Sequence, residues 1–283
     1  MHPVLVTAAL GNRGDARVFL DLVGAGVALA PFTEGGGQPG GNYCSGARER
    51  GEQSVIGQGM ELAGLMQAGP ADHILDIGSG IGGPARYFAS RFGCRVTGLD
   101  LTPEFCDVAR HFTRLLELGD RVAFEVGDAL TMPFPESSFD GAYSMNVSMN
   151  IADKRSFYRE IHRVLKPRMW LLLSELAKGE GGELDYPTPW AASAHTSFLS
   201  TPEDTRGGLE EAGFDVIRLH STLEEARMFG ARSRAMVERG EKPPHRAVML
   251  IHGELATQAM ANTARGLSDA RIVPIEVLAR KRP

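Results

Sequence analysis

The chain has 283 residues, of which 43% are hydrophobic and 23% charged. This composition is ordinary for a soluble globular protein, and a chain of this length can bury a full core without disulfides or a metal ion. The net charge is −5 and no long basic run occurs, so nucleic acid and anionic membrane surfaces are not expected partners, and no stretch reaches the ~18–20 apolar residues of a membrane helix.

The cysteines are sparse and far apart in the sequence. Cys44, Cys94 and Cys106 form no C-x-x-C pair, so we expect reduced thiols, no structural zinc and no other metal site. The apolar start MHPVLVTAALG lacks a preceding Lys or Arg and resembles a secretory signal only weakly. These features predict a cytoplasmic protein.

Two regions follow one another along the chain. Residues 1–58 give no regular pattern and contain the glycine-rich stretch FTEGGGQPGGN at 32–42, which is typical of a flexible connector. We expect them to form a separate N-terminal segment that could close a site as a lid. Residues 59–283 form the second region, and GMELAGLMQAG at 59–69 predicts a short helix that opens it.

Strands and helices then alternate along the second region. Apolar runs predict strands, and amphipathic runs bounded by Thr, Pro or Gly predict helices. The expected strands are 73–78, 94–100, 121–128, 139–145, 170–176, 214–221 and 271–281, and the expected helices are 82–92, 102–119, 153–166 and 201–213. For the helix over 102–119, Thr102 fits the N-cap, Pro103 the first turn and Gly119 the C′ position. The alternation predicts a mostly parallel sheet with helices on both faces.

Two irregular insertions interrupt this pattern, a loop over 178–200 and helical stretches over 222–266. They follow the strands that carry the expected binding edge of the sheet. We therefore expect them to form the side of the site that binds the molecule acted on, called the acceptor side below.

A glycine loop follows the first strand, in the sequence DIGSGIGG at 76–83. Gly78, Gly80 and Gly83 satisfy the dinucleotide pattern G-x-G-x-x-G. Asp76, together with Gly78, Gly80 and Gly82, satisfies a different pattern, D-x-G-x-G-x-G. The first pattern indicates hydride transfer and the second methyl transfer, and the loop alone does not decide between them.

Three acids at successive strand ends narrow the choice. Asp100, at the end of the second strand, can accept both hydroxyls of a ribose and fits either nucleotide. Asp76 would repel a pyrophosphate, by about 3 kcal/mol for unit charges ~6 Å apart at an effective dielectric near 20, but it would attract an ammonium or sulfonium. Asp128 and the next backbone N–H, of Ala129, can read the edge of an adenine. A solvated or turn-capping acid is the alternative interpretation of Asp76 and Asp128.

The stretches ILDIGSGIGG, VTGLD, GDALTMPFPESSFD and HRVLKP occur in this order. Together they resemble the signatures of class I S-adenosylmethionine-dependent methyltransferases over roughly residues 60–221. The resemblance implies a Rossmann-like seven-stranded sheet with an antiparallel last strand. GGPAR, GCRVTGLDLTPEFCDVA, MNIADKRSFYREIHRVLKP and YPTPWA are most similar to the sarcosine/dimethylglycine N-methyltransferase type.

The resemblance also implies roles for individual residues. Residues at the methionine end of S-adenosylmethionine, at its ribose and adenine, and near its sulfonium are Asp76, Gly78, Ser79, Gly80, Asp100, Leu101, Asp128, Ala129 and Asn146. One departure concerns Lys166-Pro167-Arg168-Met169, where the family usually has two glycines after the proline. Because Arg and Met resist a positive φ, we expect the turn there to adapt.

Four residues are candidates for the acceptor side. Tyr186 and Trp190 could form aromatic walls around an amine that becomes cationic, or they could simply pack in the loop. Asn150 could orient the acceptor or cap the helix near Asp153. His195 is the candidate general base, although an exposed loop histidine would look the same in the sequence.

The sequence therefore predicts a methyltransferase that acts on a small molecule, with an amine as the expected acceptor. O- or C-methylation of a phenol, quinol or natural product is the alternative within the family. An NAD-dependent oxidoreductase and a non-catalytic S-adenosylmethionine-binding partner subunit are the alternatives outside it. Either a monomer or a homodimer is compatible with the sequence.

Overall fold

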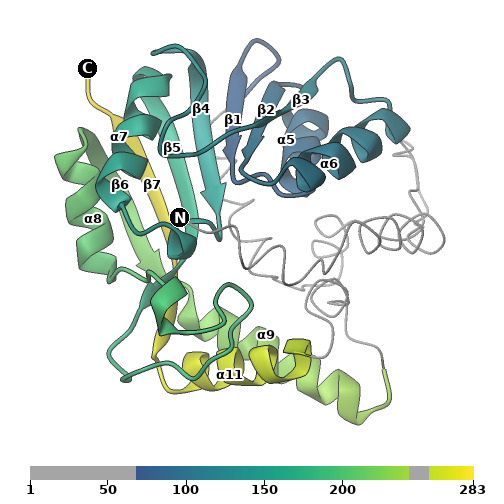
Figure 1. The fold of residues 1–283 in the computed structure, drawn as a ribbon, viewed down its shortest axis with the longest axis vertical. Coiled ribbons are helices and arrows are strands. Elements are labelled where there is room, and N and C mark those ends of the chain that lie inside the picture. The colour runs from purple at the N-terminus through teal and green to yellow at the C-terminus, as the bar shows by residue number, and fades with distance from the viewer. Residues whose placement is uncertain (1–67, 242–254) are drawn as a thin grey trace.

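The computed structural model describes residues 68–241 and 255–283 (Figure 1). The N-terminal segment 1–58, Cys44 and most of the helix expected over 59–69 lie outside the described residues, as does part of the 222–266 insertion. The remaining expectations can be compared with the structure directly.

A single seven-stranded sheet forms the centre of the described fold, with the strand order β3-β2-β1-β4-β5-β7-β6. Neighbouring strands from β3 to β5 run parallel, whereas β7 runs antiparallel to both β5 and β6. The strands are β1 (His73–Ile77), β2 (Arg95–Asp100), β3 (Val122–Val126), β4 (Phe139–Met145), β5 (Leu165–Lys178), β6 (Phe214–Ser221) and β7 (Ile272–Lys281). This arrangement confirms the Rossmann-like α/β fold with an antiparallel last strand.

Helices cover both faces of the sheet. On one face α5 (Gly83–Phe92) and α6 (Pro103–Leu115) share a core with Leu172 of β5, and on the other face α7 (Lys154–Val164) and α8 (Pro202–Glu211) share one with Leu171 and Leu173. Because successive side chains of a strand point to opposite faces, a central strand buried on both sides needs the unbroken apolar run seen in WLLL.

A third group of elements follows β6. Helices α9 (Leu223–Glu238) and α11 (Ala256–Ser268) pack against each other and against β7. In Figure 1 the parallel strands point toward this pair, so the carboxyl edge of the sheet faces the layer that α9 and α11 form. Open α/β sheets bind their ligands at that edge.

The structure corrects two helix boundaries. Helix α6 ends at Leu115, not near Gly119, and the chain leaves it through Glu117 at φ 55°. Helix α7 ends at Val164, so Pro167 lies within β5 and does not stop the helix. Within β5, Arg168 adopts φ 65°, a conformation that favours glycine. The expected adaptation of the turn is therefore a strained residue in a continuous strand.

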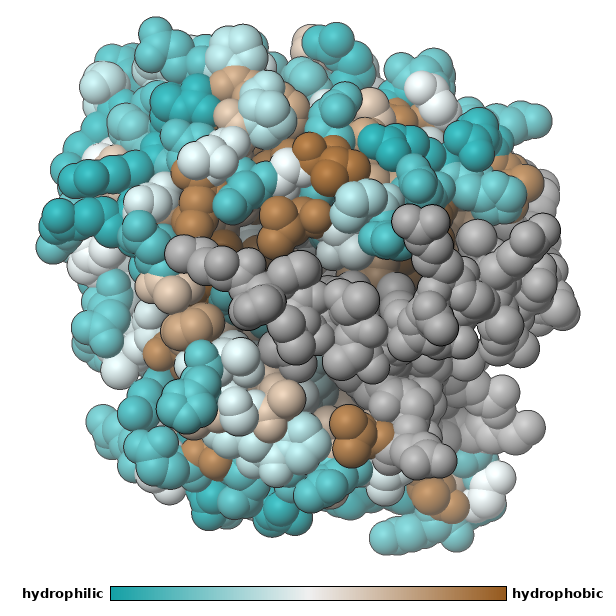
Figure 2. All heavy atoms as spheres, viewed as in Figure 1, coloured by the Kyte–Doolittle hydropathy of each residue, from teal (hydrophilic) through white to brown (hydrophobic). Residues whose placement is uncertain are grey.

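Hydrophilic side chains cover most of the margin of the face shown in Figure 2, and hydrophobic ones gather toward its middle. Among the helices of the described residues, none is long and apolar enough to cross a membrane.

Candidate functional site

The glycine loop begins where β1 ends and is tied to β2. The N–H groups of Gly78 and Ser79 both donate to the carbonyl oxygen of Leu99, at 2.8 and 3.0 Å. Gly78, Gly80 and Gly82 have φ values of 71°, 53° and 77°, a region that side chains rarely adopt. The loop therefore turns sharply under the end of the neighbouring strand.

The glycines of the loop differ in what surrounds them. A Cβ at Gly78 would lie 2.3 Å from Val147 Cγ2, and one at Gly82 would lie 2.3 Å from Phe124 Cζ, whereas a Cβ at Gly80 or Gly83 would meet no described residue within 4 Å. Gly82 thus allows close packing of the loop against Phe124, and Gly83 is not needed for that packing. Among the described residues, the space beside the Gly80 Cα is open.

Asp76 is a buried carboxylate, 2% exposed, at the end of β1. Burial raises its pKa to about 7, against a hydrogen bond from the Tyr143 hydroxyl; nearby Asp100 raises the pKa further and Arg86 lowers it. Tyr143 is the residue opposite Asp76 on β4. With a pKa of about 7, Asp76 is partly protonated at neutral pH. A cationic ligand beside it would stabilise its ionised form, whereas a pyrophosphate would not.

Asp100 holds the glycine loop with its carboxylate. Oδ2 accepts from the N–H of Gly80 at 2.8 Å, and Oδ1 accepts from the N–H of Thr102 at 2.9 Å. Each carboxylate oxygen still has a lone pair for a ribose hydroxyl. Leu101, the next residue, is 67% exposed and offers an apolar surface on which a purine can lie.

Asp128 follows β3 and organises its own turn. Its Oδ1 accepts from the N–H of Leu130 at 2.8 Å, and its carbonyl accepts from Thr131. The turn-capping interpretation of Asp128 is therefore correct as far as Oδ1 is concerned. Oδ2 of Asp128 and the N–H of Ala129 are the groups expected to contact adenine, and that role remains a prediction.

The residues present fit S-adenosylmethionine better than a dinucleotide. The Ser79 hydroxyl is buried and has no hydrogen-bond partner among the described residues, so it is free to bind a ligand. Asp76 offers negative charge for an ammonium, and Asp100 offers acceptors for a ribose. The set therefore offers a candidate partner for the ammonium and for the ribose hydroxyls.

Asn146 and Asn150 flank the segment that follows β4. Asn146 is exposed, adopts φ 57° and donates its N–H to Ser174 at 2.9 Å. Asn150 ends the short helix η2 (Ser148–Asn150) and is also exposed. The N-cap of α7 is Asp153, which accepts from Ser156, so Asn150 does not cap that helix.

The 178–200 loop packs beside this segment. Trp190 is 8% exposed, clusters with Met149 and Ile272, and donates its indole N–H to Ser197 Oγ at 3.0 Å. Tyr186 packs against the same cluster. Packing thus explains both aromatic residues. A cation–π contact between the ring of Tyr186 or Trp190 and the acceptor remains a prediction.

His195 lies in η3 (Ala194–Thr196) and is exposed. Its role as a base remains a prediction. Helix α11 anchors the loop that carries these residues, because Asn262 donates to the carbonyl of Pro187 at 2.8 Å and Asp185 accepts from Arg265 and Arg271. The candidate acceptor side is thus held in place from the α11 side.

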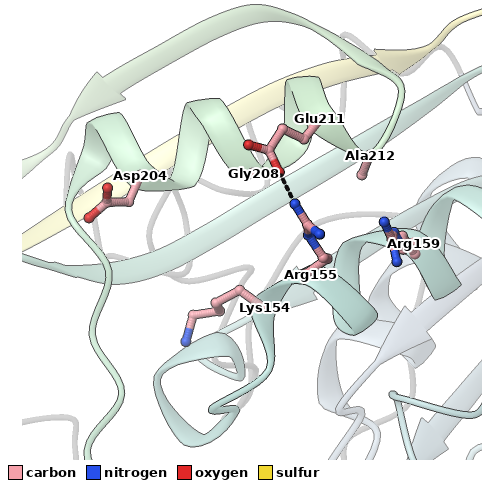
Figure 3. Close-up of a pocket in the computed structure, with 7 residues that line it drawn as sticks. All are labelled: Lys154, Arg155, Arg159, Asp204, Gly208, Glu211 and Ala212. Atoms are coloured by element: carbon pink, nitrogen blue, oxygen red, sulfur yellow. Dashed lines mark hydrogen bonds and ion pairs between the residues drawn. The ribbon is translucent and has the colours of Figure 1, made fainter.

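A separate cavity of about 420 Å³ lies between α7 and α8 (Figure 3). Its lining includes the exposed ion pair Arg155–Glu211, with 3.0 Å between nitrogen and oxygen. None of the expected cofactor or acceptor residues lines it, so we assign it no part in the reaction. Within the described residues, no group of His, Cys, Asp and Glu is arranged to hold a metal ion.

Three charged residues near the edge were missed by the sequence analysis. Arg86 lies near Asp76, and Glu175 and Lys154 hold the segment after β4. Only Glu175 carried a visible signal, because an acid in the apolar run WLLLSEL is unusual for a central strand. Arg86 and Lys154 look like ordinary charges on amphipathic helices.

Comparisons with known proteins agree with this geometry. Residues 75–173 match the family model described as a methyltransferase domain. A sterol 24-C-methyltransferase of Eremothecium gossypii is 42% identical over 34% of this chain and 26% of its own length. The O-methyltransferase cnsE of Penicillium expansum is 30% identical over 61% and 63%. A glycine/sarcosine/dimethylglycine N-methyltransferase of Actinopolyspora halophila is 30% identical over 54% and 28%. The chain thus spans less than two thirds of each of these relatives.

Solved structures share the fold over nearly the whole chain. A geranyl diphosphate C-methyltransferase from Streptomyces coelicolor, in complex with S-adenosyl-L-homocysteine, has a TM-score of 0.67 at 17% identity and covers 98% of this chain and 96% of its own. A putative sarcosine dimethylglycine methyltransferase from Galdieria sulphuraria has a TM-score of 0.66 at 19% identity, covering 95% and 98%. The [4+2]-cyclase SpnF has a TM-score of 0.63 at 21% identity, covering 99% and 96%.

The glycine loop and the acids Asp76, Asp100 and Asp128 all lie within residues 75–173, the stretch that matches the methyltransferase-domain model. The relatives that share it methylate carbon, oxygen and nitrogen by their names. The comparisons thus support the class of the domain, but they do not distinguish carbon, oxygen and nitrogen as the atom that is methylated.

Proposed function

We propose that this protein transfers a methyl group from S-adenosylmethionine to a small-molecule acceptor, with an amine as the acceptor. The observation that carries the proposal is the pair of carboxylates Asp76 and Asp100 beside the glycine loop, where Asp100 binds the N–H of Gly80. The methyltransferase-domain match over residues 75–173 supports it.

When bound, S-adenosylmethionine supplies a methyl group on a sulfonium, and an aligned nucleophile displaces the thioether. The work of the protein is therefore alignment. Asp76 attracts the ammonium of the methionine end, Asp100 holds the ribose hydroxyls, and Leu101 and Asp128 hold the adenine. Asn146 stands at the sulfonium end, at the carboxyl end of β4.

An NAD-dependent oxidoreductase fits these residues poorly. A pyrophosphate at the glycine loop would lie beside two carboxylates. The cation near them is Arg86, which is half-buried and already donates to the carbonyl oxygen of Ile81 at 2.8 Å. Repulsion of this kind amounts to roughly 3 kcal/mol for each pair of charges at ~6 Å. The charge of the site thus argues for a cationic cofactor.

The choice of an amine rests on the resemblance to glycine/sarcosine/dimethylglycine N-methyltransferases. An amine nucleophile needs alignment and a route for its proton. The aromatic residues Tyr186 and Trp190 suit the cation that forms. A phenol or quinol acceptor would need a base, for which His195 is the candidate, and a C- or O-methyltransferase is the alternative that other relatives support.

The test uses purified protein, S-adenosylmethionine with a labelled methyl group, and a panel of small amines, phenols and quinols. Label in glycine-like amines but not in phenols is the expected result. Label in phenols or quinols alone would overturn the amine assignment and make His195→Ala the next variant. We also expect no nucleic-acid or membrane partner and a cytoplasmic location.

Binding without methyl transfer is the second candidate function. The [4+2]-cyclase SpnF shares this fold, so the fold itself does not require a methyltransferase. Calorimetric binding of S-adenosylmethionine, with no label transferred to any acceptor of the panel, would favour this second function, including that of a non-catalytic partner subunit.

A further inference from the structure

Two charged side chains hold the segment 146–151 from opposite sides. Glu175 lies near the carboxyl end of β5 and is 3% exposed. Lys154 is the first residue of α7 and is half-buried. Between them, the segment leads from β4 through η2 to α7.

Glu175 binds the N–H groups at the start of this segment. Its Oε2 accepts from the N–H groups of Val147 and Ser148, both at 3.0 Å, and its Oε1 accepts from the Ser144 hydroxyl at 2.9 Å. Burial raises the pKa of Glu175, and these hydrogen bonds oppose that shift. All three donors point toward the carboxylate, an arrangement that its ionised form satisfies. The carboxylate thus fixes the backbone immediately after Asn146.

Lys154 binds the carbonyl groups of the same segment and of the acceptor-side loop. Its Nζ donates to the carbonyl oxygens of Ser148, Ile151 and Phe198, at 2.7, 2.6 and 2.6 Å. Figure 3 shows the side chain running away from the Arg155–Glu211 pair. Three acceptors match the three protons of an ammonium, so the charged form completes the set.

The held segment touches the cofactor loop directly. Val147, whose N–H Glu175 binds, packs against Gly78 so closely that a Cβ there would lie 2.3 Å from Val147 Cγ2. Its neighbour Asn146 is exposed and keeps a positive φ of 57°, which costs free energy in a residue other than glycine. A shift of the segment would therefore move both the glycine loop and Asn146.

Core packing alone does not call for these charges. Burying a carboxylate or an ammonium is unfavourable compared with burying an apolar side chain of similar size. Positions that break the apolar pattern of a central strand are typical of functional sites. Here each charge forms two hydrogen bonds with backbone groups of the same segment, and a third with Ser144 for Glu175 and with Phe198 for Lys154.

We propose that Glu175 and Lys154 are positioning residues that clamp segment 146–151, so that Val147 and Asn146 are set against the glycine loop for cofactor binding and methyl transfer; this inference rests on the function proposed above. Lys154 extends the clamp to the acceptor-side loop through Phe198. Neither side chain is assigned a contact with a reacting atom.

Protonation of Lys154 gives the clamp a distinguishing signature. Burial lowers the pKa of Lys154 to about 8, while nearby Glu175 opposes this shift. A neutral amine has only two protons for three carbonyl groups, so the clamp loosens as pH rises through about 8. The other ionisable groups around it are Tyr158, Arg155 and Arg159 of α7 and Asp204 and Glu211 of α8.

The experiment measures calorimetric binding of S-adenosylhomocysteine to the full chain, with thermal unfolding recorded alongside. Glu175→Gln places an amide NH₂ where a carboxylate accepted, and Lys154→Met removes the three donors. Each is expected to weaken binding about tenfold at pH 7, the order expected for hydrogen bonds to a charged group. Between about pH 7 and pH 9 the wild type should lose affinity that Lys154→Met does not lose, a difference that a purely structural role would not produce.

Arg155→Met is the matched control, because it removes a cation from the next position of α7 whose ion-pair partner among the described residues is exposed Glu211. Its affinity should equal that of the wild type. If Glu175→Gln fails to fold, Ser144→Ala removes only the hydroxyl that orients Oε1 and should still weaken binding. The clamp would be overturned if Lys154→Met and Glu175→Gln both kept the affinity and the pH dependence of the wild type. Ser144→Ala takes the place of Glu175→Gln in this comparison if the latter does not fold. Absence of binding by the wild type would instead overturn the proposed function, and the clamp with it.

Discussion

Asp76 is a carboxylate that the fold keeps buried at the end of β1. Its pKa of about 7 lies well above its ordinary value, chiefly because of burial. The folded chain therefore holds this proton between about pH 4 and pH 7, while the unfolded chain has released it. The stability that protonated Asp76 contributes is fully present below about pH 4 and is lost as pH rises through 7.

Asp76→Asn should remove this pH dependence. In the absence of ligand, the variant should lose less stability than the wild type between pH 4 and pH 8, by an amount on the order of 4 kcal/mol. Its affinity for S-adenosylhomocysteine should fall, because no negative charge remains for the ammonium. Thermal unfolding at several pH values and calorimetry measure the two effects. Asp120→Asn, at an exposed position, is the control, and an unchanged affinity would remove Asp76 from the cofactor site.

Asp100 combines a structural and a binding role, which the right variant can separate. Asp100→Ala removes the acceptor for two backbone N–H groups, so it should weaken both folding and binding. Asp100→Asn keeps one acceptor oxygen and should cost only about 1 kcal/mol of stability, whereas affinity for S-adenosylhomocysteine should fall roughly 10- to 100-fold. Calorimetry and denaturant unfolding on the same samples test this. Unchanged affinity in both variants would contradict the ribose assignment.

At the scale of elements, the glycine loop depends on Val147, which lies about 70 residues further along the chain. Gly78→Ala requires a positive φ and pushes a methyl group into Val147, so it should destabilise the protein by roughly 2–3 kcal/mol and weaken cofactor binding. The methyl group of Gly83→Ala would meet no atom within 4 Å in the part of the chain that the structure describes. The variant should be neutral or stabilise the first turn of α5 by up to ~1 kcal/mol. Urea unfolding of both variants decides the point, and equal stability would show that contact with Val147 does not constrain the loop.

The strands were predictable because their patterns are local. Apolar runs marked all seven strands, and the acids at the strand ends could be placed at one edge because parallel strands share a direction. The end of α6 was not predictable in this way. Gly119 offered a standard stop signal, yet the chain leaves the helix through Glu117 at φ 55°, because the connection to β3 sets the end.

The start of β5 was missed for a similar reason. Pro167 was interpreted as ending α7, but the chain is already extended from Leu165, and Arg168 adopts a positive φ within the strand. The charged clamp was missed because its partners are distant in sequence. Glu175 reaches back 31 residues to Ser144, and Lys154 reaches 44 residues forward to Phe198. No periodic pattern reports such pairs.

At the scale of the whole molecule, the candidate site is assembled from parts that contact one another only in the folded state. The carboxylates come from β1 and β2, the clamped segment lies between β4 and α7, and the acceptor-side loop is held by α11. A ligand that bridges them should therefore stabilise the whole domain and not only one loop.

Added S-adenosylhomocysteine at about 100 times its dissociation constant should raise the free energy of unfolding by about 2.7 kcal/mol, because it binds only the folded chain. For a chain of 283 residues, the midpoint of thermal unfolding should therefore rise by roughly 5 °C. NAD at the same concentration should leave the midpoint unchanged, since its pyrophosphate meets Asp76 and Asp100. A larger shift with NAD than with S-adenosylhomocysteine would mean that the carboxylates do not set the charge preference of this edge, and the methyl-transfer interpretation of the glycine loop would fail with it.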